Sequence, residues 1–227
     1  MKRNTEVLSE KKFDVVIIGA GIYGAAAAWD AVLRGLSVAL IDKGDFGGAT
    51  SSNSLKIVHG GLRYLQQLDI KRFRESVLER RRMMYLAPHL VHPLPCVMPT
   101  YGHMMKGPEV MLAGLLVNDI LSLDRNSLAD PQKRIPGGKV ISRQKCLELV
   151  PGIDPERVNG GAFWTDAQMY SSERLLLGFV ASAAASGAAA ANYVAAEQYL
   201  RDGDRITGVS ARDLVSGKTF DIRAELV

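Results

Sequence analysis

Residues 13–24 read FDVVIIGAGIYG, and this stretch decides the fold class. Its first half is a β-branched apolar run, which is typical of a buried strand. Its second half carries glycines at positions 19, 21 and 24, the GxGxxG spacing. In that spacing the first glycine makes a tight turn, the second admits a pyrophosphate to the backbone, and the third lets helix and strand pack closely. The stretch therefore predicts a strand that turns into a helix, with a phosphate site at the turn.

The residues that follow complete a strand–helix–strand unit. Residues 25–34 are rich in alanine and lack glycine and proline, which favours a helix that Gly35 ends. Residues 37–41 predict a second strand, and units of this kind form parallel sheets with right-handed crossovers. Asp42 closes that strand, where an acid can accept hydrogen bonds from the ribose hydroxyls of a dinucleotide. An acid at this place also disfavours a 2′-phosphate, so NADP is not expected.

The stretch after Asp42 separates FAD from NAD, which the glycines alone do not. An NAD-binding domain normally continues with another helix and strand. Residues 47–65 instead read GGATSSNSLKIVHGGLRYL, a dense set of hydroxyls and glycines with one histidine. A loop of this length is usually functional or disordered. This one suits a pyrophosphate and the edge of a flavin ring, so the sequence favours FAD.

The rest of the chain alternates predicted helices and strands. Five prolines between residues 88 and 108 disfavour a helix there. Patterning and capping signals predict helices over residues 62–86, 109–123, 142–150 (with Ser142 as N-cap) and 172–186. Turn signals separate predicted strands over residues 96–100, 160–166, 188–196, 205–213 and 219–227. The fold class is therefore α/β.

Composition excludes several protein classes. The 227 residues are 47% hydrophobic and 23% charged, which is typical of a globular protein and excludes a disordered or collagenous chain. The net charge of +4 is mild and, without a zinc-finger or RNA-recognition signature, does not indicate a nucleic-acid partner. The apolar stretch 110–117 is far shorter than the roughly 20 residues that span a bilayer. Two cysteines make no disulfide framework, and the four histidines show no metal-ligand spacing, so no metal is expected.

Five stretches together resemble one flavoprotein family. They read IIGAGIYGAAAA (17–28), ATSSNSLKIVHGGLRYL (49–65), ERRRMMYLAPHLVHPLP (79–95), PTYGHMMKG (99–107) and GGAFWTDAQMYSSERL (160–175). They are similar to the FAD-dependent glycerol-3-phosphate dehydrogenases, within the wider group of D-amino-acid-oxidase-like flavoproteins. The resemblance runs from about Phe13 to Val227. Its SSxSxKxxHGGxRYL stretch is far more specific than the glycine spacing.

The resemblance implies a two-domain organisation. It implies a Rossmann-like FAD-binding domain of the glutathione-reductase type, with a doubly wound parallel sheet, over residues 1–92 and 160–227. A partial α+β substrate domain is then inserted over residues 93–159. Members of the family continue well past the position of Val227. The chain is therefore expected to be an N-terminal part, with an incomplete FAD-binding domain and uncertain activity on its own.

The resemblance also implies a site and a reaction. The family oxidises sn-glycerol 3-phosphate to dihydroxyacetone phosphate and passes electrons through the flavin to quinone. His59 is the candidate base for the C2 hydroxyl, and Arg63 and Tyr64 are candidates for binding the substrate, since a guanidinium suits a phosphate. In the implied FAD site, the pyrophosphate contacts Gly19, Gly21 and Gly24, and the adenosine ribose contacts Asp42. The pyrophosphate and ribityl region also contacts Thr50, Ser51 and Ser52. The isoalloxazine ring lies against Ser54, Lys56, Ile57, Val58 and His59, and the adenine contacts the backbone of Ala196.

Alternatives stay open at this point. The chain could belong to an FAD-dependent oxidoreductase of the group that acts on an amino or hydroxy acid, or it could be a non-catalytic FAD-binding fragment. His59 could bond only the flavin or backbone, and Arg63 could be a surface or capping cation. The basic run Lys71–Arg82 is predicted to be a solvated helix face, with a patch on an anionic bilayer as the alternative. A cytoplasmic location, peripheral association with the cytoplasmic membrane and an oligomer are expectations of the same kind.

Overall fold

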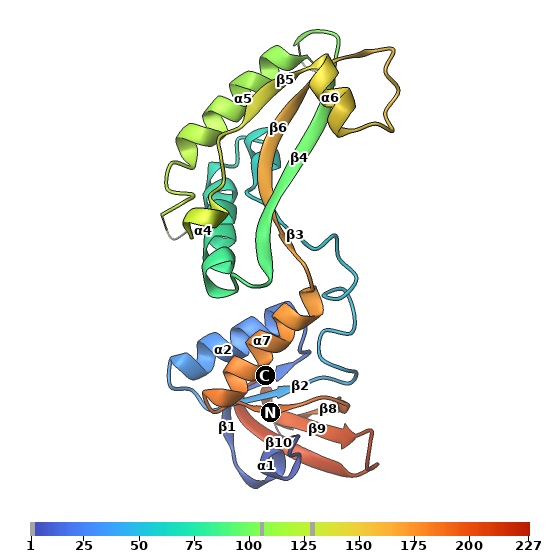
Figure 1. Cartoon of the computed structure of the whole chain (residues 1–227). Coiled ribbons are helices and arrows are strands. Elements are labelled where there is room, and N and C mark those ends of the chain that lie inside the picture. The colour runs from blue at the N-terminus through green and yellow to red at the C-terminus, as the bar shows by residue number, and fades with distance from the viewer. Residues whose placement is uncertain (1–2, 105–106, 128–129) are drawn as a thin grey trace. The chain divides into compact units, whose positions relative to one another are not determined.

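The computed structural model describes residues 3–104, 107–127 and 130–227, and the chain divides into two compact units (Figure 1). The first unit consists of Met1–Leu55 and Ser171–Val227, and the second of Lys56–Tyr170. These boundaries differ from the predicted ones because residues 56–92 and 160–170 pack with the middle of the chain. The two units are defined by which residues pack together, and not by which residues bind a cofactor. The assignment of residues 56–92 to a cofactor-binding domain therefore stays a prediction.

A six-stranded sheet forms the centre of the first unit, in the order β7-β2-β1-β10-β9-β8. Strands β7, β2, β1 and β10 run parallel, while β10, β9 and β8 form an antiparallel meander. The register pairs Val15 with Val38 and Phe13 with Ala224. The strand bounds are β1 (Phe13–Ile18), β2 (Val38–Ile41), β7 (Ala189–Ala191), β8 (Val194–Asp202), β9 (Arg205–Asp213) and β10 (Thr219–Leu226). The predicted α/β class with a parallel sheet is confirmed.

Both faces of this sheet are covered. On one face lie helices α2 (Ile22–Leu33) and α7 (Ser172–Ala185), which pack against each other, with the Trp29 and Phe179 rings edge to face. The buried set on this face includes alanines of α2 together with Leu176 and Val180 of α7. The short helix α1 (Glu6–Glu10) shares the other core cluster with the meander. Burial of these apolar side chains is the main source of the unit's stability.

The second unit is built on the long strand β6 (Val158–Met169). Strand β4 (Val91–Tyr101) pairs antiparallel with it along one edge, and β3 (Ile57–Val58) and β5 (Lys139–Ser142) pair with it along the other. Prolines alternate along β4, which is possible because an edge strand can lack N–H donors on its open side. The helices of this unit are α3 (Leu62–Leu65), α4 (Ile70–Leu86), α5 (Pro108–Leu121) and α6 (Arg143–Leu149). Pro131–Lys133 form a 3₁₀ turn.

Two predicted elements were wrong because non-glycine residues adopt a positive φ. The single helix predicted over residues 62–86 is broken into α3 and α4, since Leu68 has φ 55°. Asp69 then caps α4 by accepting from the Arg72 N–H. The single strand predicted over 188–196 is two strands, β7 and β8, because Tyr193 with φ 53° turns the chain between them. Neither residue type favours that conformation, so the sequence carried no signal for it.

The remaining predicted elements are present with modest shifts at their ends. The predicted strand 96–100 is the middle of the longer β4, and the predicted strand 160–166 lies inside β6. Ser142 caps α6 as predicted, since its hydroxyl accepts from the Lys145 N–H. Among the described residues, no helix has the length and apolar character needed to cross a bilayer.

Candidate functional site

The glycine turn joins β1 to α2 in the geometry that the spacing predicts. Gly19 has φ +101°, a conformation that side chains disfavour. A Cβ atom built on Gly24 would lie 1.9 Å from the carbonyl oxygen of Gly19, so only glycine lets the helix start this close to the strand. Gly21 is the N-cap of α2, and it has no side chain that could cap the N–H groups of the first turn. A helix start of this kind suits an anion.

Asp42 ties the end of β2 to this turn. Its half-buried carboxylate accepts hydrogen bonds from the Ala20 N–H at 2.7 Å and from the Gly44 N–H at 2.8 Å. A carboxylate has about four acceptor positions, so two backbone donors leave capacity for ribose hydroxyls. The structure therefore places Asp42 beside the glycine turn, where the sequence analysis expected it. Its contact with a ribose stays a prediction.

Ser51 lies against the first turn of α2. Its hydroxyl oxygen accepts from the Ile22 N–H at 3.0 Å and would lie 3.2 Å from a Cβ atom on Gly21. Thr50, Ser52 and Ser54 lie in the same loop as Ser51, and the Ser52 hydroxyl donates to the Ala49 carbonyl. Of the predicted hydroxyls, that of Ser51 therefore lies at the start of α2. Thr50, Ser52 and Ser54 are its neighbours in sequence.

Ala196 lies in β8, at the edge of the sheet. The ladder to β9 is irregular here, because the register shifts between Ala196 and Gln198. Backbone groups on the open side of an edge strand can pair with a ligand. This placement agrees with a backbone contact to adenine but does not test it.

The first unit's donors fit the pyrophosphate and ribose of FAD. The start of α2 offers backbone N–H groups and the positive end of the helix dipole. The close packing of Gly24 against the Gly19 carbonyl keeps the helix start near the strand, and Ser51 adds a hydroxyl. Asp42 supplies the acceptor at the end of β2. The chemistry of this set matches a dinucleotide rather than a free cation.

The second unit holds the other half of the predicted site. The turn His59-Gly60-Gly61, called the HGG turn below, leads from β3 into α3. His59 and Arg63 are exposed and Tyr64 is half-buried, and the His59 and Tyr64 rings meet edge to face at 5.9 Å. Ile57 and Val58 form β3, while the Lys56 carbonyl accepts from the Met169 N–H.

The predicted set therefore divides between the two units. The first unit carries Gly19, Gly21, Gly24, Asp42, Thr50, Ser51, Ser52, Ser54 and Ala196; the second carries Lys56, Ile57, Val58, His59, Arg63 and Tyr64. Within the second unit, the His59 and Tyr64 rings are in contact, and Arg63 precedes Tyr64 in α3.

Sequence reasoning missed the buried pair Arg80–Asp166. Arg80 was grouped with the basic run, but it is only 4% exposed, and its Nη1 lies 2.8 Å from Asp166 Oδ1. Burial lowers the pKa of the Arg80 guanidinium, and the Asp166 carboxylate opposes that shift. The Asp166 carboxylate also accepts from the Gly60 N–H at 2.6 Å and from Trp164 Nε1 at 3.0 Å. Spacing along α4 does not reveal this pair, because the partner lies on β6.

The other arginines of the basic run also have carboxylate partners. Arg74 and Arg81 both pair with Asp124, and hydrogen bonding to Arg74 is the main cause that lowers the pKa of Asp124 to about 2. Arg72 pairs with Asp69, and Arg82 with Glu79. The predicted solvated face is therefore only part of the role of this run, which also joins α4 to β6 and to the segment after α5.

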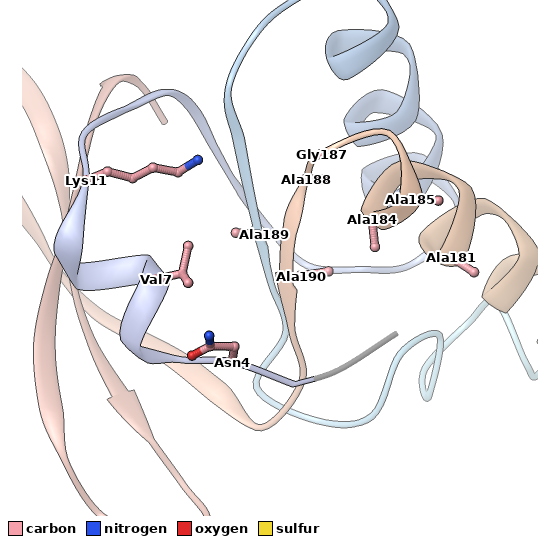
Figure 2. A pocket seen from close by; sticks show the side chains of 10 residues that line it. All are labelled: Asn4, Val7, Lys11, Ala181, Ala184, Ala185, Gly187, Ala188, Ala189 and Ala190. Atoms are coloured by element: carbon pink, nitrogen blue, oxygen red, sulfur yellow. The ribbon is translucent and has the colours of Figure 1, made fainter.

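A cavity of about 370 Å³ lies in the first unit, and no predicted site residue is among those that line it (Figure 2). Its lining is mostly alanine from the end of α7 and from β7, and Asn4 and Lys11 supply its polar side chains. Both of these polar side chains are exposed, so the lining contains no buried polar side chain that would indicate a bound ligand. Across the described part of the chain, no cluster of three His, Cys, Asp or Glu residues could hold a metal ion.

Comparisons with known proteins show the family to which the chain belongs. The family described as FAD dependent oxidoreductase (DAO) matches residues 14–227. A glycerol-3-phosphate dehydrogenase of Synechocystis sp. is 36% identical over 223 residues, which are 98% of this chain and 39% of that protein. An alpha-glycerophosphate oxidase of Streptococcus pneumoniae is 38% identical over 222 residues, 97% of this chain and 35% of that protein.

A solved structure shows the same fold. The glycerol-3-phosphate dehydrogenase from Bacillus halodurans, complexed with FAD, has a TM-score of 0.69 and 26% identity. The match covers 97% of this chain and 34% of that one. The chain thus spans about a third of the length of the relatives that it matches.

Proposed function

We propose, from the premise that the chain belongs to the DAO family of FAD-dependent oxidoreductases, that it supplies the cofactor cradle and part of the substrate site of an sn-glycerol 3-phosphate dehydrogenase. The product of the oxidation is dihydroxyacetone phosphate. One observation carries the proposal: a glycine turn fitted to a dinucleotide and an HGG turn with a histidine, an arginine and a tyrosine occur in one chain. Two relatives that are more than 30% identical to this chain are named glycerol-3-phosphate dehydrogenase and alpha-glycerophosphate oxidase.

FAD would be held by the first unit's residues and by the strand before the HGG turn. Gly21, Gly24 and Ser51 would hold the pyrophosphate at the start of α2, and Asp42 the ribose. Ala196 would contact adenine through its backbone. Residues 54–59 (Ser54, Lys56, Ile57, Val58 and His59 among them), with Thr50 and Ser52 before them, would contact the rest of the cofactor. The bound flavin supplies the hydride acceptor, which no side chain can provide.

The chain's own residues bind the substrate and move its proton. Arg63 is exposed, and its guanidinium can take a phosphate in a bidentate manner. His59 lies in the HGG turn before α3, is exposed, and can accept the proton of the C2 hydroxyl. The edge-to-face contact with the Tyr64 ring restricts the His59 imidazole, which favours one orientation for that proton transfer.

The proposal includes a quinone acceptor and a cytoplasmic location with peripheral membrane association. A membrane surface would suit an enzyme that delivers electrons to a lipid-soluble quinone. Because all five arginines of the run Lys71–Arg82 have carboxylate partners, we expect little of the attraction to come from this run. Flotation on liposomes with and without anionic headgroups tests this: strong recovery on anionic liposomes alone, abolished by Lys71→Gln, would contradict it.

The decisive test of the reaction is anaerobic bleaching of the flavin. We expect the absorbance of the FAD-loaded protein to fall on addition of sn-glycerol 3-phosphate, because the substrate reduces the flavin. Glycine, proline and 2-hydroxyglutarate serve as matched controls and are expected to leave the flavin oxidised. Bleaching by one of these compounds, with none by sn-glycerol 3-phosphate, would assign the chain to an amino- or hydroxy-acid oxidoreductase instead.

A further inference from the structure

A buried ion pair lies directly beneath the HGG turn. Arg80 and Asp166 are 4% and 8% exposed, and neither is a predicted cofactor or substrate contact. Removing two charges from water is costly, and buried ion pairs can often be replaced by apolar residues of similar size without loss of stability. Stability alone therefore gives no reason for this pair.

Every polar atom of the Asp166 carboxylate is engaged. Oδ1 accepts from the Gly60 N–H at 2.6 Å and from Arg80 Nη1 at 2.8 Å. Oδ2 accepts from Trp164 Nε1 at 3.0 Å, and Arg80 Nη1 also donates to the Thr165 carbonyl at 3.1 Å. These contacts fix the carboxylate plane, and through it the backbone at Gly60.

Both glycines of the turn are pressed onto α4. A Cβ atom on Gly60 would lie 2.2 Å from Arg80 Nη1. Gly61 has φ +82°, and a Cβ atom on it would lie 2.9 Å from the Ser76 Cβ atom. The turn therefore has one position relative to α4 and β6, and the residues on either side of it, His59 and Arg63, take their directions from that position.

We propose that Arg80 and Asp166 are positioning residues, which hold the Gly60 N–H so that the HGG turn presents His59 and Arg63 in fixed directions. The catalytic consequence rests on the proposed function, since there His59 and Arg63 face the substrate. The positioning itself does not, because it concerns only contacts within the second unit. Asp166 acts through the backbone of Gly60, and Arg80 acts through Asp166.

The test compares two double variants that differ only in the acceptor at position 166. Arg80→Met with Asp166→Leu removes both charges and the acceptor of the Gly60 N–H. Arg80→Met with Asp166→Asn removes the charges but keeps an oxygen in reach of that N–H. Arg82→Met, an exposed arginine paired with Glu79 on the same helix, is the matched control.

Hydrogen exchange of the Gly60 amide and the imidazole resonances of His59, both followed by NMR, are the readouts, and neither needs flavin. We expect Gly60 exchange to accelerate by about tenfold in the leucine variant, as loss of one hydrogen bond implies. The amide of Val77, in the core of α4, should be unchanged and reports overall stability. The asparagine variant keeps the acceptor of the Gly60 N–H but loses Arg80, so its Gly60 exchange should lie between that of the leucine variant and that of the parent chain. Arg82→Met should stay close to the parent chain.

Equal Gly60 exchange in the leucine and asparagine variants would overturn the proposal. If the leucine variant does not fold, Arg80→Met with Asp166→Val replaces it, since valine also removes the acceptor of the Gly60 N–H. Gly60 exchange in that variant equal to that in the asparagine variant would likewise overturn the proposal. If the NMR results are as expected but sn-glycerol 3-phosphate never bleaches the FAD-loaded parent, the proposed function fails and the positioning role stands.

Discussion

Substitution of Gly24 by alanine is expected to destabilise the first unit by about 3 kcal/mol or more, because overpacking against rigid backbone is not relieved by side-chain movement. The added methyl group would lie 1.9 Å from the Gly19 carbonyl oxygen and 3.3 Å from the Ile17 side chain. Either α2 moves away from β1 or the turn opens, and both would remove the proposed cradle for the pyrophosphate. Denaturant unfolding, followed by far-UV circular dichroism, measures the loss.

Gly178→Ala is the matched control for this prediction. Gly178 lies inside α7 of the same unit, and a Cβ atom there meets nothing within 4 Å. Alanine in an exposed helix interior stabilises by roughly 0.5–1 kcal/mol relative to glycine. The two substitutions are therefore expected to have opposite signs. Similar effects at both positions would mean that helix propensity, and not the close approach of α2 to β1, governs Gly24.

His59→Ala is expected to slow the reduction of bound flavin by sn-glycerol 3-phosphate by about 10²- to 10⁴-fold, the usual contribution of a general base. Because the pyrophosphate cradle belongs to the first unit, the affinity for FAD should change far less. Stopped-flow flavin absorbance gives the rate, and an FAD titration gives the affinity. The measurement separates a proton acceptor from a residue that only contacts the cofactor.

The control for His59 is His103→Ala. His103 belongs to the same unit, is exposed and pairs with Glu109 near the start of α5. Its loss should leave both flavin reduction and FAD affinity close to those of the parent. If His59→Ala instead weakens FAD binding strongly while reduction of the remaining bound flavin stays fast, His59 is a flavin contact and another group takes the proton.

Local chemistry made much of the first unit predictable. The spacing of Gly19, Gly21 and Gly24 defines a turn with its own backbone geometry, and Asp42 follows at the end of the next strand. These features depend on residues near one another in sequence, so a short stretch contains the whole signal. The structure adds the contacts that hold the turn, such as the hydrogen bond from the Ile22 N–H to Ser51.

Features that depend on distant partners were not predictable. Arg80 sits in a run that looks like a solvated helix face, and only the packing of α4 on β6 brings it to Asp166. The positive φ angles of Leu68 and Tyr193 were not predictable either, because neither residue type favours that conformation. The boundary of the second unit likewise follows from the pairing of β3 and β4 with β6, which no local pattern shows.

Equilibrium titration of the unmodified chain with FAD tests the central claim most directly. We predict saturable binding of a single FAD per chain, seen as a change in flavin fluorescence, with NAD unable to displace it. FMN, which lacks the adenosine half that Asp42 and Ala196 would hold, is expected to bind much more weakly. A folded chain that does not bind FAD, or one that binds NAD in its place, would contradict the assignment of an FAD cradle to this turn.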